Sequence, residues 1–187
     1  MPPIRCFPKA VTPEPPMSEI ADEGGVSKAL LFHYFKNKKE LYLYLWENAM
    51  EMTRKALREY RVLETNDFFE MLKRSLLSKY ALMREYPHMY AFSLRAYYET
   101  ASEIKSAIHE NFSDVSKTSE MIVFEKMDTS RLRKDIDLKT MYDEIFYAID
   151  GYMLKKYCSN LIIPDEIERE IISLIDFWKK VYTQKEA

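Results

Sequence analysis

The residues of this chain that could take part in chemistry gather in one short basic stretch, residues 27–39. It contains four lysines and no acidic residue, and Phe32, His33, Tyr34 and Phe35 are interleaved with the lysines. Lysine ammonium groups bind phosphates, and a short exposed helix fits the major groove of DNA. The stretch therefore predicts a nucleic-acid contact on a chain whose net charge is only −2.

Patterns typical of enzymes and metal sites are missing from the sequence. None of the three histidines has a second histidine or a cysteine three or four residues away, and 3 glycines are too few for a phosphate-binding loop. Cys6 and Cys158 lie far apart in the sequence, which favours neither a zinc site nor a disulfide framework. We expect no enzymatic activity, no metal and no cofactor.

The composition favours an all-α protein. The chain has 187 residues, 47% of them hydrophobic and 31% charged, and the 3 glycines are fewer than a sheet with many tight turns would use. No apolar stretch approaches the roughly 20 residues of a membrane span, and no signal peptide is recognisable. A cytoplasmic location without membrane contact is therefore expected.

Proline and the helical period divide the chain into three parts. Six of the 8 prolines lie in the first 16 residues, so residues 1–17 are expected to form an irregular arm. Residues 18–46 would form a helix-turn-helix domain, and residues 47–187 a helical domain for effector binding and dimerisation. Apolar spacing and capping residues predict helices over residues 18–23, 27–32, 38–63, 67–86, 87–98, 100 or 102 to 126, 137–159 and 164–182.

The first two of these helices and the turn between them predict a helix-turn-helix. Gly25 suits the turn because glycine adopts a positive φ without a Cβ clash. The segment resembles the TetR family of transcriptional regulators over about 22 residues, in Ile20-Ala21, Gly25-Val26-Ser27-Lys28, Leu31, His33-Tyr34-Phe35, Lys36-Asn37-Lys38 and Glu40-Leu41. The resemblance implies a repressor that binds a double-stranded DNA operator and is released by a small-molecule effector.

The resemblance also implies roles for individual residues of this segment. Ser27, Lys28 and Ala29 would face base edges at the start of the recognition helix. His33 and Tyr34 would lie near the groove wall, and Lys38 would add its charge to the N-terminal end of the next helix, where a phosphate binds favourably. The alternative is a helical interaction module that keeps a degenerate helix-turn-helix and does not bind DNA.

One element of the family is not recognisable in this sequence. A TetR-like head has a further helix before the helix-turn-helix, but here that region is the proline-rich arm. Ile20, Leu31 and Phe35 would then lose part of their cover. We expect a loosely packed head with poor operator affinity on a helical body that remains folded.

The helical body has residues that suit an effector pocket and a dimer interface. Large flexible and aromatic side chains often line apolar cavities, and they also form ordinary cores. The family places its effector among these helices, which implies a small apolar or aromatic ligand contacted by Tyr86, Met89, Phe92, Tyr97 and Phe112.

The last two helices carry apolar stripes that suit a homodimer formed by a four-helix bundle. Their spacing predicts an interface of Met141, Ile145, Ile149, Tyr152, Ile167, Ile171, Leu174 and Trp178. The same stripes would also suit a core within one chain.

Overall fold

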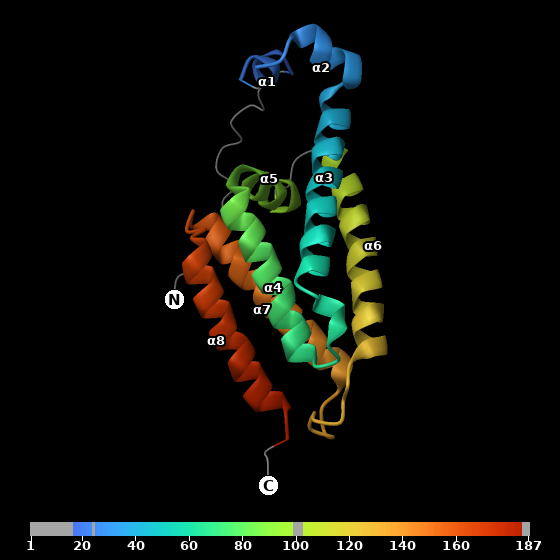
Figure 1. Ribbon diagram of the computed structural model, residues 1–187, viewed down its shortest axis with the longest axis vertical. Coiled ribbons are helices and arrows are strands. Elements are labelled where there is room, and N and C mark those ends of the chain that lie inside the picture. Colours follow the sequence, from blue (N-terminus) through green and yellow to red (C-terminus); the bar gives the residue numbers. More distant parts are fainter. Residues whose placement is uncertain (1–16, 24, 99–102, 185–187) are drawn as a thin grey trace.

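The computed structural model describes residues 17–23, 25–98 and 103–184, and in these ranges the chain is all-α, as expected from the composition (Figure 1). The helices are α1 (Met17–Glu23), α2 (Lys28–Tyr34), α3 (Lys38–Glu59), the short 3-10 helix η1 (Val62–Glu64), α4 (Phe68–Glu85), α5 (Pro87–Tyr98), α6 (Glu103–Lys126), α7 (Leu138–Cys158) and α8 (Pro164–Tyr182). The arm predicted for residues 1–17 lies outside the described residues, apart from Met17.

Capping side chains set the helix starts that the sequence predicted. Asn37 accepts a hydrogen bond from the Glu40 N–H (2.9 Å), and Asp137 accepts one from the Thr140 N–H (2.8 Å). Such caps satisfy backbone donors that have no partner within the helix. Three bounds differ from the predictions: α1 begins at Met17, α2 continues to Tyr34, and α3 ends at Glu59.

The head, formed by α1 and α2, lies at one end of an elongated body, and α3 runs from the head along the body (Figure 1). The main core of the body joins α4, α7 and α8. Its largest fully buried side chains are Tyr80, Met141, Ile145, Ile167 and Ile171. A smaller cluster of Trp46, Ala96 and Ile108 holds α3, α5 and α6 together nearer the head. The head is thus attached to a body that has its own core.

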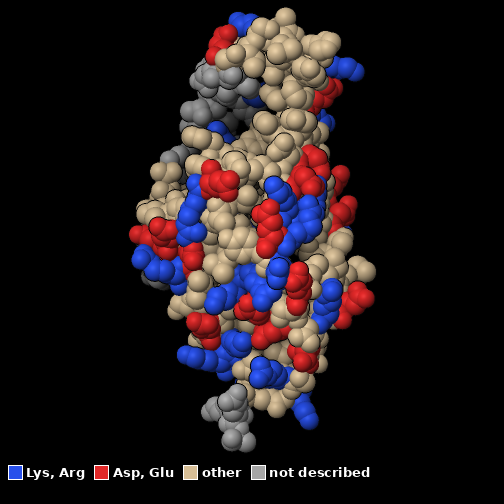
Figure 2. All heavy atoms as spheres, in the orientation of Figure 1, with Lys and Arg blue, Asp and Glu red and all other residues tan. Residues whose placement is uncertain are grey.

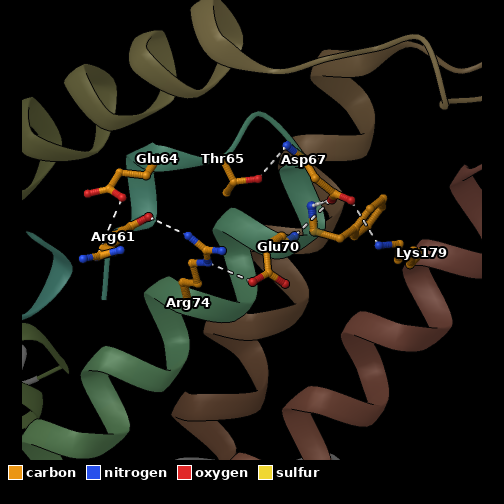
Figure 3. Close-up of polar contacts among 8 residues, drawn as sticks. Arg61, Glu64, Thr65, Asp67, Glu70, Arg74 and Lys179 are labelled. Atoms are coloured by element: carbon orange, nitrogen blue, oxygen red, sulfur yellow. Dashed lines mark hydrogen bonds and ion pairs between the residues drawn. The ribbon is translucent and has the colours of Figure 1, made fainter. Parts of the chain in front are cut away.

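A polar network joins the end of α3 and η1 to α4 and α8, far from the head (Figure 3). The Arg74 guanidinium donates to Glu70 (2.8 Å) and to the Arg61 carbonyl (3.0 Å), and Lys179 of α8 donates to Asp67 (3.1 Å). Burial acts to raise the pKa of Asp67, but backbone N–H groups and the Lys179 ammonium outweigh it and lower this pKa. The network fixes the start of α4, the helix at the centre of the body.

Two observations concern the predictions on membrane spans and on disulfides. No helix in the described ranges combines the length and the apolar character needed to cross a bilayer. Cys158 is disulfide-bonded, and Cys6 lies outside the described residues. Two widely spaced cysteines argue against a framework of several disulfides, but they do not exclude a single bond.

Candidate nucleic-acid interface

The turn between α1 and α2 has the geometry that the sequence predicted for Gly25. Its φ is +65°, and its N–H donates to the Asp22 carbonyl (3.3 Å). The next N–H, of Val26, donates to the Ala21 carbonyl (3.0 Å). Both bonds satisfy carbonyls at the end of α1. Because side chains with a Cβ rarely adopt this φ, glycine is what allows the chain to reverse here and begin α2.

Helix α2 is presented to solvent along its whole length. Ser27 caps it and accepts from the Leu30 N–H (3.1 Å), and no residue of the helix is buried. Lys28 and Ala29 follow the cap and are exposed, and the Lys28 ammonium lies 3.7 Å from the Asp22 carboxylate. An ion pair this exposed is worth at most about 1 kcal/mol, so it leaves Lys28 available to another anion.

The end of α2 and the start of α3 carry the other predicted DNA contacts. His33 and Tyr34 are exposed, and their rings meet edge to face with centroids 5.3 Å apart. Lys38 is the first residue of α3, directly after the Asn37 cap, and is half-buried. Glu40 accepts from the Lys36 N–H (2.9 Å), which fixes the bend between the two helices. All six predicted residues therefore lie within one segment around α2 and its flanking bends, and five of them are exposed.

The head contributes little buried surface of its own. Leu31 and Phe35 are only half-buried, whereas Ala21 of α1 is fully buried. Leu30 is 47% exposed and Phe32 is 50% exposed. On the face shown in Figure 2, charged side chains of both signs cover the body, and the head is mostly uncharged. Helix α2 is thus weakly buried, and loose packing of the head stays a prediction.

Residues 16–45 match the family described as bacterial regulatory proteins, tetR family. These residues are therefore a DNA-binding domain of the TetR type. Regulators with this domain are non-enzymatic, and the domain implies binding to operator DNA and a dimer. None of the curated proteins matches the chain.

Two solved structures share the fold of this chain. The fatty acid degradation regulator FadR from Bacillus halodurans has a TM-score of 0.63 and 16% identity, with 89% of this chain and 86% of that one covered. The ketosteroid transcriptional regulator KstR2 of Mycobacterium tuberculosis has a TM-score of 0.51 and 13% identity, with 91% of this chain and 86% of that one covered. At these identities the likeness concerns the fold.

The predicted effector contacts have different surroundings. Tyr97 and Phe112 pack together with ring centroids 4.7 Å apart, whereas Phe92 contacts Tyr42 in the smaller cluster near the head. Tyr86 is 41% exposed at the end of α4. A cleft of about 550 Å³ opens at the far end of the body, and the residues lining it include Asp67, Arg131 and Lys179 but none of the five.

The structure places five of the eight residues of the predicted dimer interface inside the single chain. Met141, Ile145, Ile167, Ile171 and Trp178 are buried within the single chain, where they belong to its main core. Ile149, Tyr152 and Leu174 pack against the same core. Periodicity identifies the apolar face of a helix but not the partner that covers that face. Here α4 covers much of the apolar stripe predicted for the dimer.

The structure shows other apolar side chains on the outer faces of α7 and α8. Tyr147 is 74% exposed, Leu154 37% and Phe177 57%. Gly151 lies between Tyr147 and Leu154 at helical spacing, and a Cβ built on it would meet nothing within 4 Å. The spacing of Tyr147, Gly151 and Leu154, four and then three residues apart, was the signal in the sequence for this second, weaker stripe.

Proposed function

We propose that this TetR-family chain represses transcription by binding operator DNA as a dimer, with α2 as the recognition helix, and that a small effector releases it. The observation that carries this proposal is the exposure of α2: a capped helix after a tight turn, with no buried residue and with Lys28 and Ala29 open to solvent. Such a helix is suited to enter a major groove.

In this proposal residues 18–46 form the DNA-binding domain and residues 47–187 the effector-binding and dimerisation domain, with residues 1–17 as an arm before them. Helix α3 passes through the boundary, because Trp46 is buried in the body and Tyr42 packs against the same cluster. A change in the body can therefore move the head through α3. An effector shifts the spacing of two heads only if it binds one arrangement better than the other.

The predicted residues divide into two kinds of contact. Ser27, Lys28 and Ala29, at the start of α2, would meet base edges, whereas His33, Tyr34 and Lys38 would contact the groove wall and the phosphates. The Lys38 charge adds to the positive N-terminal end of α3, a helix of 22 residues. Contacts to phosphate are expected to weaken steeply as salt rises.

The effector is proposed to be apolar or aromatic. The two structures with the same fold are named as regulators of fatty acid degradation and of ketosteroids, which are largely apolar compounds. Tyr86, Met89, Phe92, Tyr97 and Phe112 remain candidate contacts, and the packing of Tyr97 against Phe112 makes this pair the first to test.

The exposed apolar side chains of the head favour one alternative function. Leu30 and Phe32 are each about half exposed, and a helical module that binds another protein would also present such side chains. In that case the head would bind no duplex DNA at moderate salt.

Two lysine variants test the proposed division of contacts. Lys38→Ala is expected to weaken binding to the operator and to random DNA alike, and to reduce the salt slope by about 1. Lys28→Ala is expected to cost about 1–3 kcal/mol on the operator and little on random DNA. Fluorescence anisotropy with both duplexes at several salt concentrations measures these effects.

The matched control is Lys117→Ala, which removes an exposed lysine from α6 and should change neither affinity. Equal effects of Lys28→Ala and Lys38→Ala on both duplexes would contradict the assigned roles.

A further inference from the structure

The buried face of α4 has a lysine at its centre. Successive residues of an α-helix are rotated by about 100°, so six residues of α4 lie within about 60° of Lys79 around the helix. Five of the six are apolar and no more than 8% exposed: Phe68, Leu72, Leu76, Leu82 and Met83. The sixth, Ser75, is half-buried. Lys79 itself is half-buried, so solvent reaches part of a side chain that is surrounded by core residues.

No acidic group compensates the charge of Lys79. Among the described residues it has no hydrogen bond and no ion pair, and burial alone lowers the pKa of its ammonium group. Other cations of the body are paired: Lys156, with a side chain only 16% exposed, lies 3.0 Å from Glu170, and Lys179 lies 3.1 Å from Asp67. Buried cations without a partner are rare because desolvation is costly.

The side of α4 that carries Lys79 faces the interior of the body. Phe68 lies on nearly the same side, three turns earlier, and its ring contacts Tyr142 of α7 with centroids 6.2 Å apart. The adjacent Tyr80 is 2% exposed, and its hydroxyl has no hydrogen-bond partner among the described residues. Two consecutive residues of α4 thus hold polar groups that make no bond to another side chain in the described part of the chain.

We propose that the Lys79 ammonium group binds the anionic head group of an amphipathic effector whose apolar body packs against the core face of α4. The proposal rests on the effector-controlled regulation proposed above, and it adds the charge of the ligand. An anion arriving from solvent would supply the partner that the chain does not provide. A lysine ammonium acts as a compact charge, so either a carboxylate or a phosphate satisfies it.

The test compares three probes with the same ten-carbon chain: decanoate, decyl phosphate and 1-decanol, each below its aggregation concentration. Isothermal titration calorimetry on the full chain measures their dissociation constants. One or both anions are expected to bind about 10- to 100-fold more tightly than 1-decanol, which is the scale of a hydrogen bond to a charged group. Comparing the two anions distinguishes a carboxylate from a phosphate ligand.

Two substitutions remove the charge: Lys79→Met and Lys79→Gln, either of which suffices if the other does not fold by circular dichroism. Each is expected to abolish the preference for the anions while leaving the affinity for 1-decanol nearly unchanged. The matched control is Lys73→Met, which removes a half-buried lysine from a different face of α4 and should keep the preference.

Three outcomes would overturn the proposal: equal binding of anions and alcohol by the unaltered chain, a preference that survives in the Lys79 variants, or no binding of any probe. Operator binding is measured separately with and without the bound anion. An anion that binds through Lys79 but leaves operator affinity unchanged would contradict effector release and leave the Lys79 site intact.

Discussion

The lysines of this chain differ in what surrounds their ammonium groups. Lys28 is exposed beside Asp22, where solvent screening makes the pair weak and leaves the cation free to exchange partners. Lys156 and Lys179 hold helices together through carboxylates of Glu170 and Asp67. Lys79 has apolar neighbours instead, and its charge costs stability in the absence of a ligand.

The cost of the Lys79 charge predicts a pH-dependent effect of Lys79→Met. Because burial lowers the folded-state pKa below the ordinary value of 10.5, the unfolded chain binds the proton more tightly. The charge of Lys79 therefore lowers the free energy of unfolding below pH 10.5. This loss of stability disappears once the folded and the unfolded chain have both lost the proton. Lys79→Met is expected to stabilise the chain at pH 7 by about 1–3 kcal/mol, the usual cost of a buried polar group without a partner.

Urea unfolding of Lys79→Met and the unaltered chain at pH 7, 9 and 10.5 measures this difference. The stabilisation should shrink as the pH rises, and Lys73→Met should show no such trend. A loss of stability at pH 7, or a gain that does not change with pH, would contradict the position assigned to Lys79.

At the scale of elements, local signals predicted the helices well and long-range contacts were predicted poorly. Pro87 and Pro164 open α5 and α8 as expected, because proline at the first helical position needs no N–H partner. The end of α3 was placed too late, since Arg61 adopts a left-handed conformation (φ 53°) without a glycine to mark it. Nothing local identified Lys79 as a buried cation, because burial depends on helices distant in the sequence.

The DNA contacts could be predicted from local sequence, whereas the dimer contacts depend on long-range packing and could not. The segment around Ser27 and Lys28 could be predicted because its residues are consecutive and match a family pattern. The stripe of Ile167 and Ile171 was correctly identified as apolar, but only tertiary structure shows that it faces the chain's own core.

The weak burial of α2 leads to a prediction for the head as an element. Adding a family-like first helix before residue 18 should cover Leu31 and Phe35, and each fully buried side chain of this size contributes about 1.5–3 kcal/mol. Operator affinity is then expected to rise at least tenfold, because less binding energy is used to order the head. A gel shift comparing both chains measures the gain, and equally tight, specific binding by the unaltered chain would contradict it.

For the whole molecule, the outer face of α7 is proposed as a dimer contact. Gly151→Arg places a long cation between Tyr147 and Leu154, and within one chain there is room for it. The variant should fold normally and shift the molecule from dimer to monomer at micromolar concentration. Analytical ultracentrifugation measures this change. The control is Met121→Arg on α6, a 72% exposed position that should leave the dimer intact; a Gly151→Arg dimer would contradict the proposed face.

The central claim is that α2 binds specific DNA as part of a dimeric regulator. Selection from a random duplex pool, followed by anisotropy on the enriched sequence and a scrambled one, tests it most directly. Two symmetry-related heads predict an enriched inverted repeat, bound more tightly than the scrambled duplex, with the difference reduced by Lys28→Ala. If neither the chain nor its version with an added first helix enriches any sequence, the account of α2 as a recognition helix is contradicted.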